Sequence, residues 1–96
     1  MRMSKIHVTP VHPGEVLLDE LEEIGLTQTA LAKHMRVSPN TINKICRGKS
    51  GIGVEMAVKL SKVLGGSPRF WLNLQNNWKL SLLDEADFMD IKPIAA

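Results

Sequence analysis

Side chains that can hydrogen-bond to DNA bases are concentrated between residues 38 and 44. The amides of Asn40 and Asn43 can pair with the edge of an adenine, Lys44 can donate to O6 or N7 of a guanine, and the Ser38 hydroxyl suits several bases. Basic, amide and hydroxyl side chains around them suit phosphate oxygens, and such contacts position a protein on DNA without reading its sequence. These side chains are Gln28, Arg36, Thr41, Arg47, Lys49 and Ser50. The combination predicts a surface for double-stranded DNA.

Charge is divided into separate segments of the chain. Residues 24–54 contain bases and no acid, whereas residues 15–23 contain acids and no base. A second acidic group, formed by Asp84, Glu85, Asp87 and Asp90, lies near the carboxyl end. Although the net charge is only +2, a basic middle between acidic flanks favours a polyanion on one face and a different partner on another. The alternative is a solvated charged surface that binds nothing.

The residues suited to DNA fall on two short predicted helices joined by a tight turn. Thr27 is a good N-cap for a helix over 28–35, and Ser38 followed by Pro39 starts a helix over 39–47 that Gly48 ends. This is the helix-turn-helix arrangement, whose second helix enters the major groove. Ala32 is small where the helices meet, while Val37, Ile42 and Ile45 are apolar where they must pack inward. Arg36 occupies a turn position that often has positive φ, which costs a non-glycine residue about 1 kcal/mol.

Three further helices are predicted to hold this pair. Pro13 opens a helix whose Leu17, Leu21 and Ile24 recur at helical spacing before Gly25, and a second helix covers 54–64. A third, over 68–83, is more apolar than one packed stripe requires. No segment alternates with period two, so the fold class is all-α: one five-helix domain over 1–96 with a core of about 12–84, a flexible amino-terminal arm and a carboxyl-terminal tail from 86.

Other functional classes lack the residues that they need. The single cysteine, Cys46, and three histidines offer no familiar metal spacing, and no nucleophile is paired with a base. The few aromatic residues provide no stacking platform for single-stranded RNA. We therefore expect no enzyme activity, cofactor or metal. Since the sequence contains neither a long apolar run nor a secretory signal, we also expect a cytoplasmic protein with no membrane partner.

Three motifs resemble a known family. Residues 28–32 together with Ile42, Gly48 and Lys49 resemble the phage-repressor-like (XRE/Cro) helix-turn-helix domains, although Arg36 replaces the usual turn glycine. The segments His-Pro-Gly-Glu-Val-Leu at 12–17 and Gly-Ser-Pro-Arg-Phe-Trp-Leu-Asn-Leu-Gln at 66–75 resemble the HigA (VapI-like) antitoxins. The resemblance implies a five-helix protein that binds its operator as a dimer, represses its own operon and blocks a HigB toxin, a RelE-like ribonuclease.

Two further surfaces are expected from these considerations. Leu74, Trp78 and Leu82 are candidates for a homodimer interface, unless the tail covers them as a second core layer. Acidic side chains could hold a basic ribonuclease toxin, first those of Glu15, Asp19, Glu20, Glu22 and Glu23, and second the carboxyl-terminal group. A stand-alone repressor with no toxin partner has the same DNA-binding residues and remains the alternative.

Overall fold

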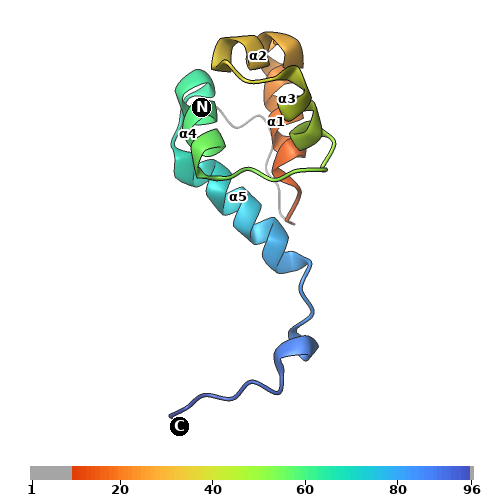
Figure 1. The fold of residues 1–96 in the computed structure, drawn as a ribbon, viewed down its shortest axis with the longest axis vertical. Helices are drawn as coiled ribbons and strands as arrows, with labels where there is room; N and C mark the ends of the chain where they lie inside the picture. Colours follow the sequence, from red (N-terminus) through yellow and green to blue (C-terminus); the bar gives the residue numbers. More distant parts are fainter. Residues whose placement is uncertain (1–9, 96) are drawn as a thin grey trace.

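The computed structural model describes residues 10–95, which form five α helices and a short 3-10 helix (Figure 1). The α helices are α1 (Pro13–Ile24), α2 (Gln28–Met35), α3 (Pro39–Cys46), α4 (Val54–Leu64) and α5 (Pro68–Ser81), and the 3-10 helix η1 spans Glu85–Phe88. The all-α prediction is confirmed, with no strand in the described part of the chain. The expected arm lies mostly in residues 1–9, outside the described residues.

Capping side chains explain where the helices begin. Proline occupies the first turn of α1, α3 and α5, where its missing N–H is not needed. The Thr27 hydroxyl accepts a hydrogen bond of 3.0 Å from the Ala30 N–H, and the Ser38 hydroxyl accepts one of 3.1 Å from Asn40. Ser67 precedes α5 without a side-chain capping bond.

Two helices end earlier than the sequence predicts. α3 ends at Cys46 with Arg47 as its C-cap, and α5 ends at Ser81 rather than 83. The Ser81 hydroxyl donates to the Trp78 carbonyl oxygen at 2.6 Å, a local bond that competes with continuation of the helix. The tail then forms η1, for which the sequence shows no helical pattern, and the Asp84 carboxylate caps it by accepting from the Ala86 N–H at 3.0 Å.

The core lies where α1 to α4 meet the first half of α5. Leu17, Leu31, Ile42, Leu60 and Trp71, one from each helix, are fully buried there. The prediction that Ile24 completes the buried stripe of α1 is wrong, because its side chain is 52% exposed in the last turn. Glu20 instead shares the buried face of α1 with Val16 and Leu17.

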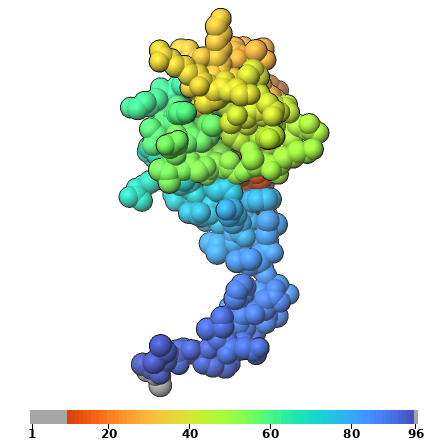
Figure 2. Space-filling view, viewed as in Figure 1, coloured from red at the N-terminus to blue at the C-terminus, as the bar shows by residue number. Residues whose placement is uncertain are grey.

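The second half of α5 and the tail project away from this core. The body is rounded and the tail leaves it at one end (Figures 1 and 2), so that the chain measures 52 × 26 × 21 Å. Leu80, Leu82 and Leu83 are exposed at the point of departure. The tail therefore does not form a second core layer over α5. Between residues 10 and 95, no helix is long and apolar enough to cross a membrane.

Candidate nucleic-acid interface

The turn between α2 and α3 has the geometry expected of a helix-turn-helix. Arg36 lies in the left-handed region, with φ 60° and ψ 41°, and is the one non-glycine residue of positive φ among the described residues. The next residue, Val37, is half-buried, and its N–H donates to the Ala32 carbonyl oxygen at 2.9 Å. Ala32 has no exposed surface, so the small side chain lies where the two helices pack. Arg36 therefore adopts the left-handed conformation that glycine usually provides at this position, and the turn keeps its expected geometry.

One face of α3 is exposed and polar. Asn40, Lys44 and Arg47 follow one another at a spacing of four and then three residues and are exposed, while Ile42 and Ile45 are buried on the other side. Thr41 and Asn43 are half-buried at the edge of this face. The Ser38 oxygen already accepts the capping bond, so its hydroxyl can still act as a donor.

The structure joins two predicted residues that the sequence assigned to different roles. The Asn43 amide donates from Nδ2 to Oε1 of Gln28 at 3.3 Å. Gln28 is the first residue of α2, so this bond links the amino-terminal end of α2 to the exposed face of α3. Their positions on a DNA surface are therefore coupled.

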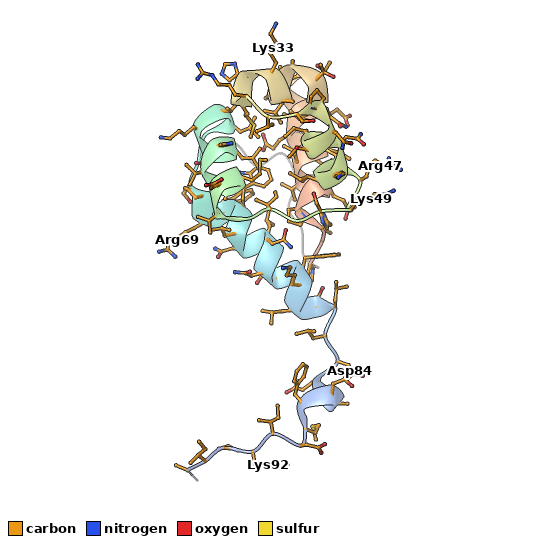
Figure 3. The ribbon with its side chains drawn as sticks, in the orientation of Figure 1. Lys33, Arg47, Lys49, Arg69, Asp84 and Lys92 are labelled. Carbon is orange, nitrogen blue, oxygen red and sulfur yellow. The ribbon has the colours of Figure 1, made fainter. Side chains whose placement is uncertain are left out.

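The loop after α3, residues 47–53, carries the remaining predicted phosphate contacts. The Lys44 carbonyl oxygen accepts from the N–H groups of Lys49 (2.8 Å) and Ser50 (3.3 Å), which turns the chain back against α3. Lys49 is exposed and points to the same side of the molecule as Arg47, whereas Lys33 points away from α2 in another direction (Figure 3). Ile52 anchors the far end of the loop in the core.

Two buried polar residues that sequence reasoning did not select hold this loop. Gln75 of α5 accepts a 2.6 Å hydrogen bond at Oε1 from the Ile52 N–H. His12 accepts from the Gly14 N–H at Nδ1 (2.9 Å), which caps α1, and is hydrogen-bonded to the Ser50 backbone. Its ring also meets the edge of Trp78, with centroids 4.6 Å apart. Both residues occur in the end motifs, and Gln75 follows the buried Trp71 by four residues, which is the spacing that could have indicated its burial.

The environment of His12 keeps its imidazole neutral. Burial lowers its pKa below the ordinary 6.5, and this effect outweighs the Ser50 hydrogen bond and the charge of Glu15, both of which raise the pKa. The neutral form is required because Nδ1 can accept from Gly14 only when it carries no proton.

Comparison with known proteins identifies the family to which this fold belongs. Residues 17–71 match the family described as Helix-turn-helix. The chain belongs to that family. It is 41% identical over 75 residues to Antitoxin HigA-1 of Vibrio cholerae, covering 77% of this chain and 70% of the relative. It is 39% identical over 83 residues to Virulence-associated protein I of Dichelobacter nodosus, covering 85% and 77%.

A solved structure adds DNA to the comparison. The Pseudomonas aeruginosa antitoxin HigA, solved with the higBA promoter, is 35% identical, with a TM-score of 0.81 over 91% of this chain and 99% of that one. The resemblance to the HigA (VapI-like) antitoxins is thereby confirmed. This family of helix-turn-helix proteins consists of DNA-binding regulators and is not a class of enzymes.

The acidic surface of the helix-turn-helix protein is smaller than the sequence predicts. Glu20 is only 4% exposed, so the expectation that it belongs to an exposed acidic surface is wrong; it lies on the packed side of α1. Glu15, Glu22 and Glu23 are exposed and Asp19 is half-buried. The second group, Asp84, Glu85, Asp87 and Asp90, is exposed on and around η1.

The three candidates for a dimer interface differ in their environments. Leu74 is partly buried against the core, and Trp78 is partly buried against His12. Leu82 is 63% exposed, beside the exposed Leu80 and Leu83. An exposed apolar surface therefore exists at the end of α5, and of the three predicted residues it includes Leu82.

Among residues 10–95, no group of three or more histidine, cysteine or acidic side chains is placed to hold a metal ion. Cys46 is buried on the inner side of α3, and burial raises the pKa of its thiol.

Proposed function

We propose that this protein is a dimeric operator-binding repressor of its own operon and an antitoxin that neutralises a basic, RelE-like ribonuclease. The observation that carries the DNA-binding part is the exposed face of α3, which presents Asn40, Lys44 and Arg47 from a segment, residues 24–54, that contains no acid. The P. aeruginosa relative solved with promoter DNA supports the same role for this chain.

In this proposal α3 is the recognition helix in the major groove. Ser38, Asn40, Asn43 and Lys44 read bases, with Asn43 held in register by its bond to Gln28. The phosphate contacts come from Gln28, Arg36, Thr41, Arg47, Lys49 and Ser50. A two-fold dimer would place two such helices about 34 to 36 Å apart, one turn of DNA.

Alanine substitutions on α3 test this assignment. Asn40→Ala or Lys44→Ala is expected to cost about 1 to 3 kcal/mol of binding to the promoter duplex upstream of the gene and to relax preference at one base pair. Arg69→Ala is a matched control, because Arg69 is exposed on the opposite side of the molecule from Arg47 and Lys49 (Figure 3). Equal binding by the α3 variants and the control in a mobility-shift titration would contradict the assignment.

The antitoxin part rests on the likeness to Antitoxin HigA-1 and on acids outside the DNA surface. Glu15, Glu22 and Glu23 are exposed on α1, and Asp84 lies on the tail, far from Arg47 and Lys49 (Figure 3). A basic enzyme could bind either group while DNA is bound. The alternative, a stand-alone repressor, predicts that no small basic ribonuclease is encoded beside the gene.

A further inference from the structure

The loop after α3 is held to that helix over its first half. The Gly48 N–H donates to the Ile45 carbonyl oxygen, and the N–H groups of Lys49 and Ser50 donate to that of Lys44, before residues 51–53 run to α4 without regular structure. Phosphate contacts require side chains in fixed positions, because the phosphates along a duplex are regularly spaced. The position of the second half of the loop depends on the residues that pack against it.

Gln75 contacts the loop from inside the protein. Its side chain is 5% exposed, and its Oε1 accepts from the Ile52 N–H at 2.6 Å. The amide also lies against the main chain of Gly51, where a Cβ would come within 2.6 Å of Oε1 and 2.9 Å of Cδ and Nε2. Only glycine fits at position 51 while Gln75 keeps this place.

The core alone does not explain a glutamine at this position. Gln75 Nε2 is buried with no hydrogen-bond partner, as is the Nε1 of Trp71 one helical turn before it. A buried donor without an acceptor destabilises a protein, but an apolar side chain of similar volume would leave the buried Ile52 N–H without its acceptor. What Gln75 contributes here is the hydrogen bond to the loop.

A second contact joins the loop to α5 from the other side. The His12 imidazole is hydrogen-bonded to the Ser50 backbone and packs against the Trp78 ring. The loop is thus attached to α5 directly through Gln75 and indirectly through His12 and Trp78.

We propose that Gln75 is a positioning residue for DNA binding: it fixes the loop at Gly51 and Ile52 so that Lys49 and Ser50 meet the phosphate backbone. The inference rests on the proposed function, since it concerns the phosphate contacts of the same surface. It assigns to α5 a part in DNA binding through a buried side chain.

Two variants disturb the contact from opposite sides. Gln75→Met keeps the length of the side chain but removes the acceptor for Ile52, and Gly51→Ala puts a Cβ into the space of the Gln75 amide. Asn76→Ala, at an exposed position on α5, and Gly53→Ala, with nothing within 4 Å of the added Cβ, are the matched controls. Thermal unfolding establishes that each variant is folded before DNA is added.

The readout is affinity for the promoter duplex and for an unrelated duplex over a range of KCl concentrations. Both variants are expected to bind both duplexes on the order of tenfold more weakly at low salt, with a salt slope shallower by about one unit, which is the loss of about one phosphate contact. The base preference among promoter variants stays the same, because α3 is unchanged. The controls keep the wild-type affinity and slope.

A double-mutant cycle with Lys49 shows whether Gln75→Met weakens DNA binding through the loop. If Gln75 acts through the loop, Gln75→Met has little further effect in a Lys49→Ala background. Fully additive losses, or wild-type affinity and slope in both variants, would overturn the inference while leaving the DNA-binding function intact. Should Gln75→Met not fold, Gly51→Ala gives the decision alone. If the wild-type protein binds neither duplex, the proposed function itself fails.

Discussion

At the scale of single residues, His12 combines three contacts in one imidazole. It caps α1 through Gly14, is hydrogen-bonded to the Ser50 backbone and packs on Trp78. Histidine is not among the preferred N-cap residues, so its presence is explained by the contacts beyond the cap. A proton on Nδ1 would remove the capping bond, and the residue therefore makes stability depend on pH.

The first prediction concerns that dependence. The folded protein lowers the pKa of His12, so below pH 6.5 the unfolded chain binds more protons than the folded protein. The free energy of unfolding therefore decreases as the pH is lowered. The contribution of His12 is complete above pH 6.5 and is lost as pH falls through the lower pKa of the folded state. Urea unfolding between pH 5 and 8 measures it.

His12→Asn is the reference variant for this measurement. Asparagine is a good N-cap but does not titrate, so the difference between the two proteins isolates the imidazole from the other ionisable groups. We expect the wild type to lose more stability than the variant between pH 7 and 5. Parallel curves would show that protonation of His12 is not linked to folding.

At the scale of elements, the junction of α2 and α3 depends on the left-handed backbone of Arg36. Its φ of 60° strains a residue with a Cβ, whereas glycine adopts it freely. Arg36→Gly is expected to stabilise the protein by up to about 1 kcal/mol and to weaken DNA binding, with a salt slope smaller by about one unit. Thermal unfolding and a salt titration of DNA binding measure the two effects separately.

Arg36→Gln separates charge from backbone strain. It loses the charge but keeps the Cβ, so its DNA binding should match that of Arg36→Gly without the gain in stability. A stability increase in both variants would attribute the effect to charge repulsion instead.

The helices themselves were largely predictable from local signals. Pro13 and Gly25 mark the two ends of α1, the Thr27 hydroxyl marks the start of α2, and the glycines on either side of α4 mark its bounds. The end of α5 was not predictable, because Ser81 bonds to its own helix and the leucines beyond it find no core. Glu20, His12 and Gln75 were missed for a related reason: periodicity identifies apolar faces, whereas these polar side chains are buried by tertiary contacts.

At the scale of the whole molecule, the projecting end of α5 favours self-association. Leu80, Leu82 and Leu83 are exposed together there. We expect a dimer in sedimentation at micromolar concentration, and Leu82→Asp is expected to shift it to monomer by placing a charge in the interface. Ile24→Asp is the control, because Ile24 is a comparably exposed apolar residue in the last turn of α1. A wild-type protein that stays monomeric even on DNA would refute the interface.

Charge reversal on α1 tests whether acidic side chains bind the proposed toxin. Glu15→Lys with Glu22→Lys is expected to reduce co-purification of a basic ribonuclease encoded beside the gene and to weaken its salt dependence, since both acids are exposed. Glu55→Lys reverses an exposed acid in the first turn of α4 and serves as the control. If neither this pair nor reversal of the acids around η1 changes toxin binding, attraction between charges does not hold the complex.

The buried thiol of Cys46 makes local opening of α3 measurable. It is the one cysteine of the chain, on the inner side of α3, with a pKa that burial raises. Because burial shields the sulfur and disfavours the reactive thiolate, we expect an alkylating reagent to react with it mainly while α3 is detached from the core. The rate of alkylation therefore reports how readily α3 detaches from the core. We expect bound DNA to slow the alkylation of Cys46 by stabilising α3 in its place, although the sulfur lies on the inner side of that helix.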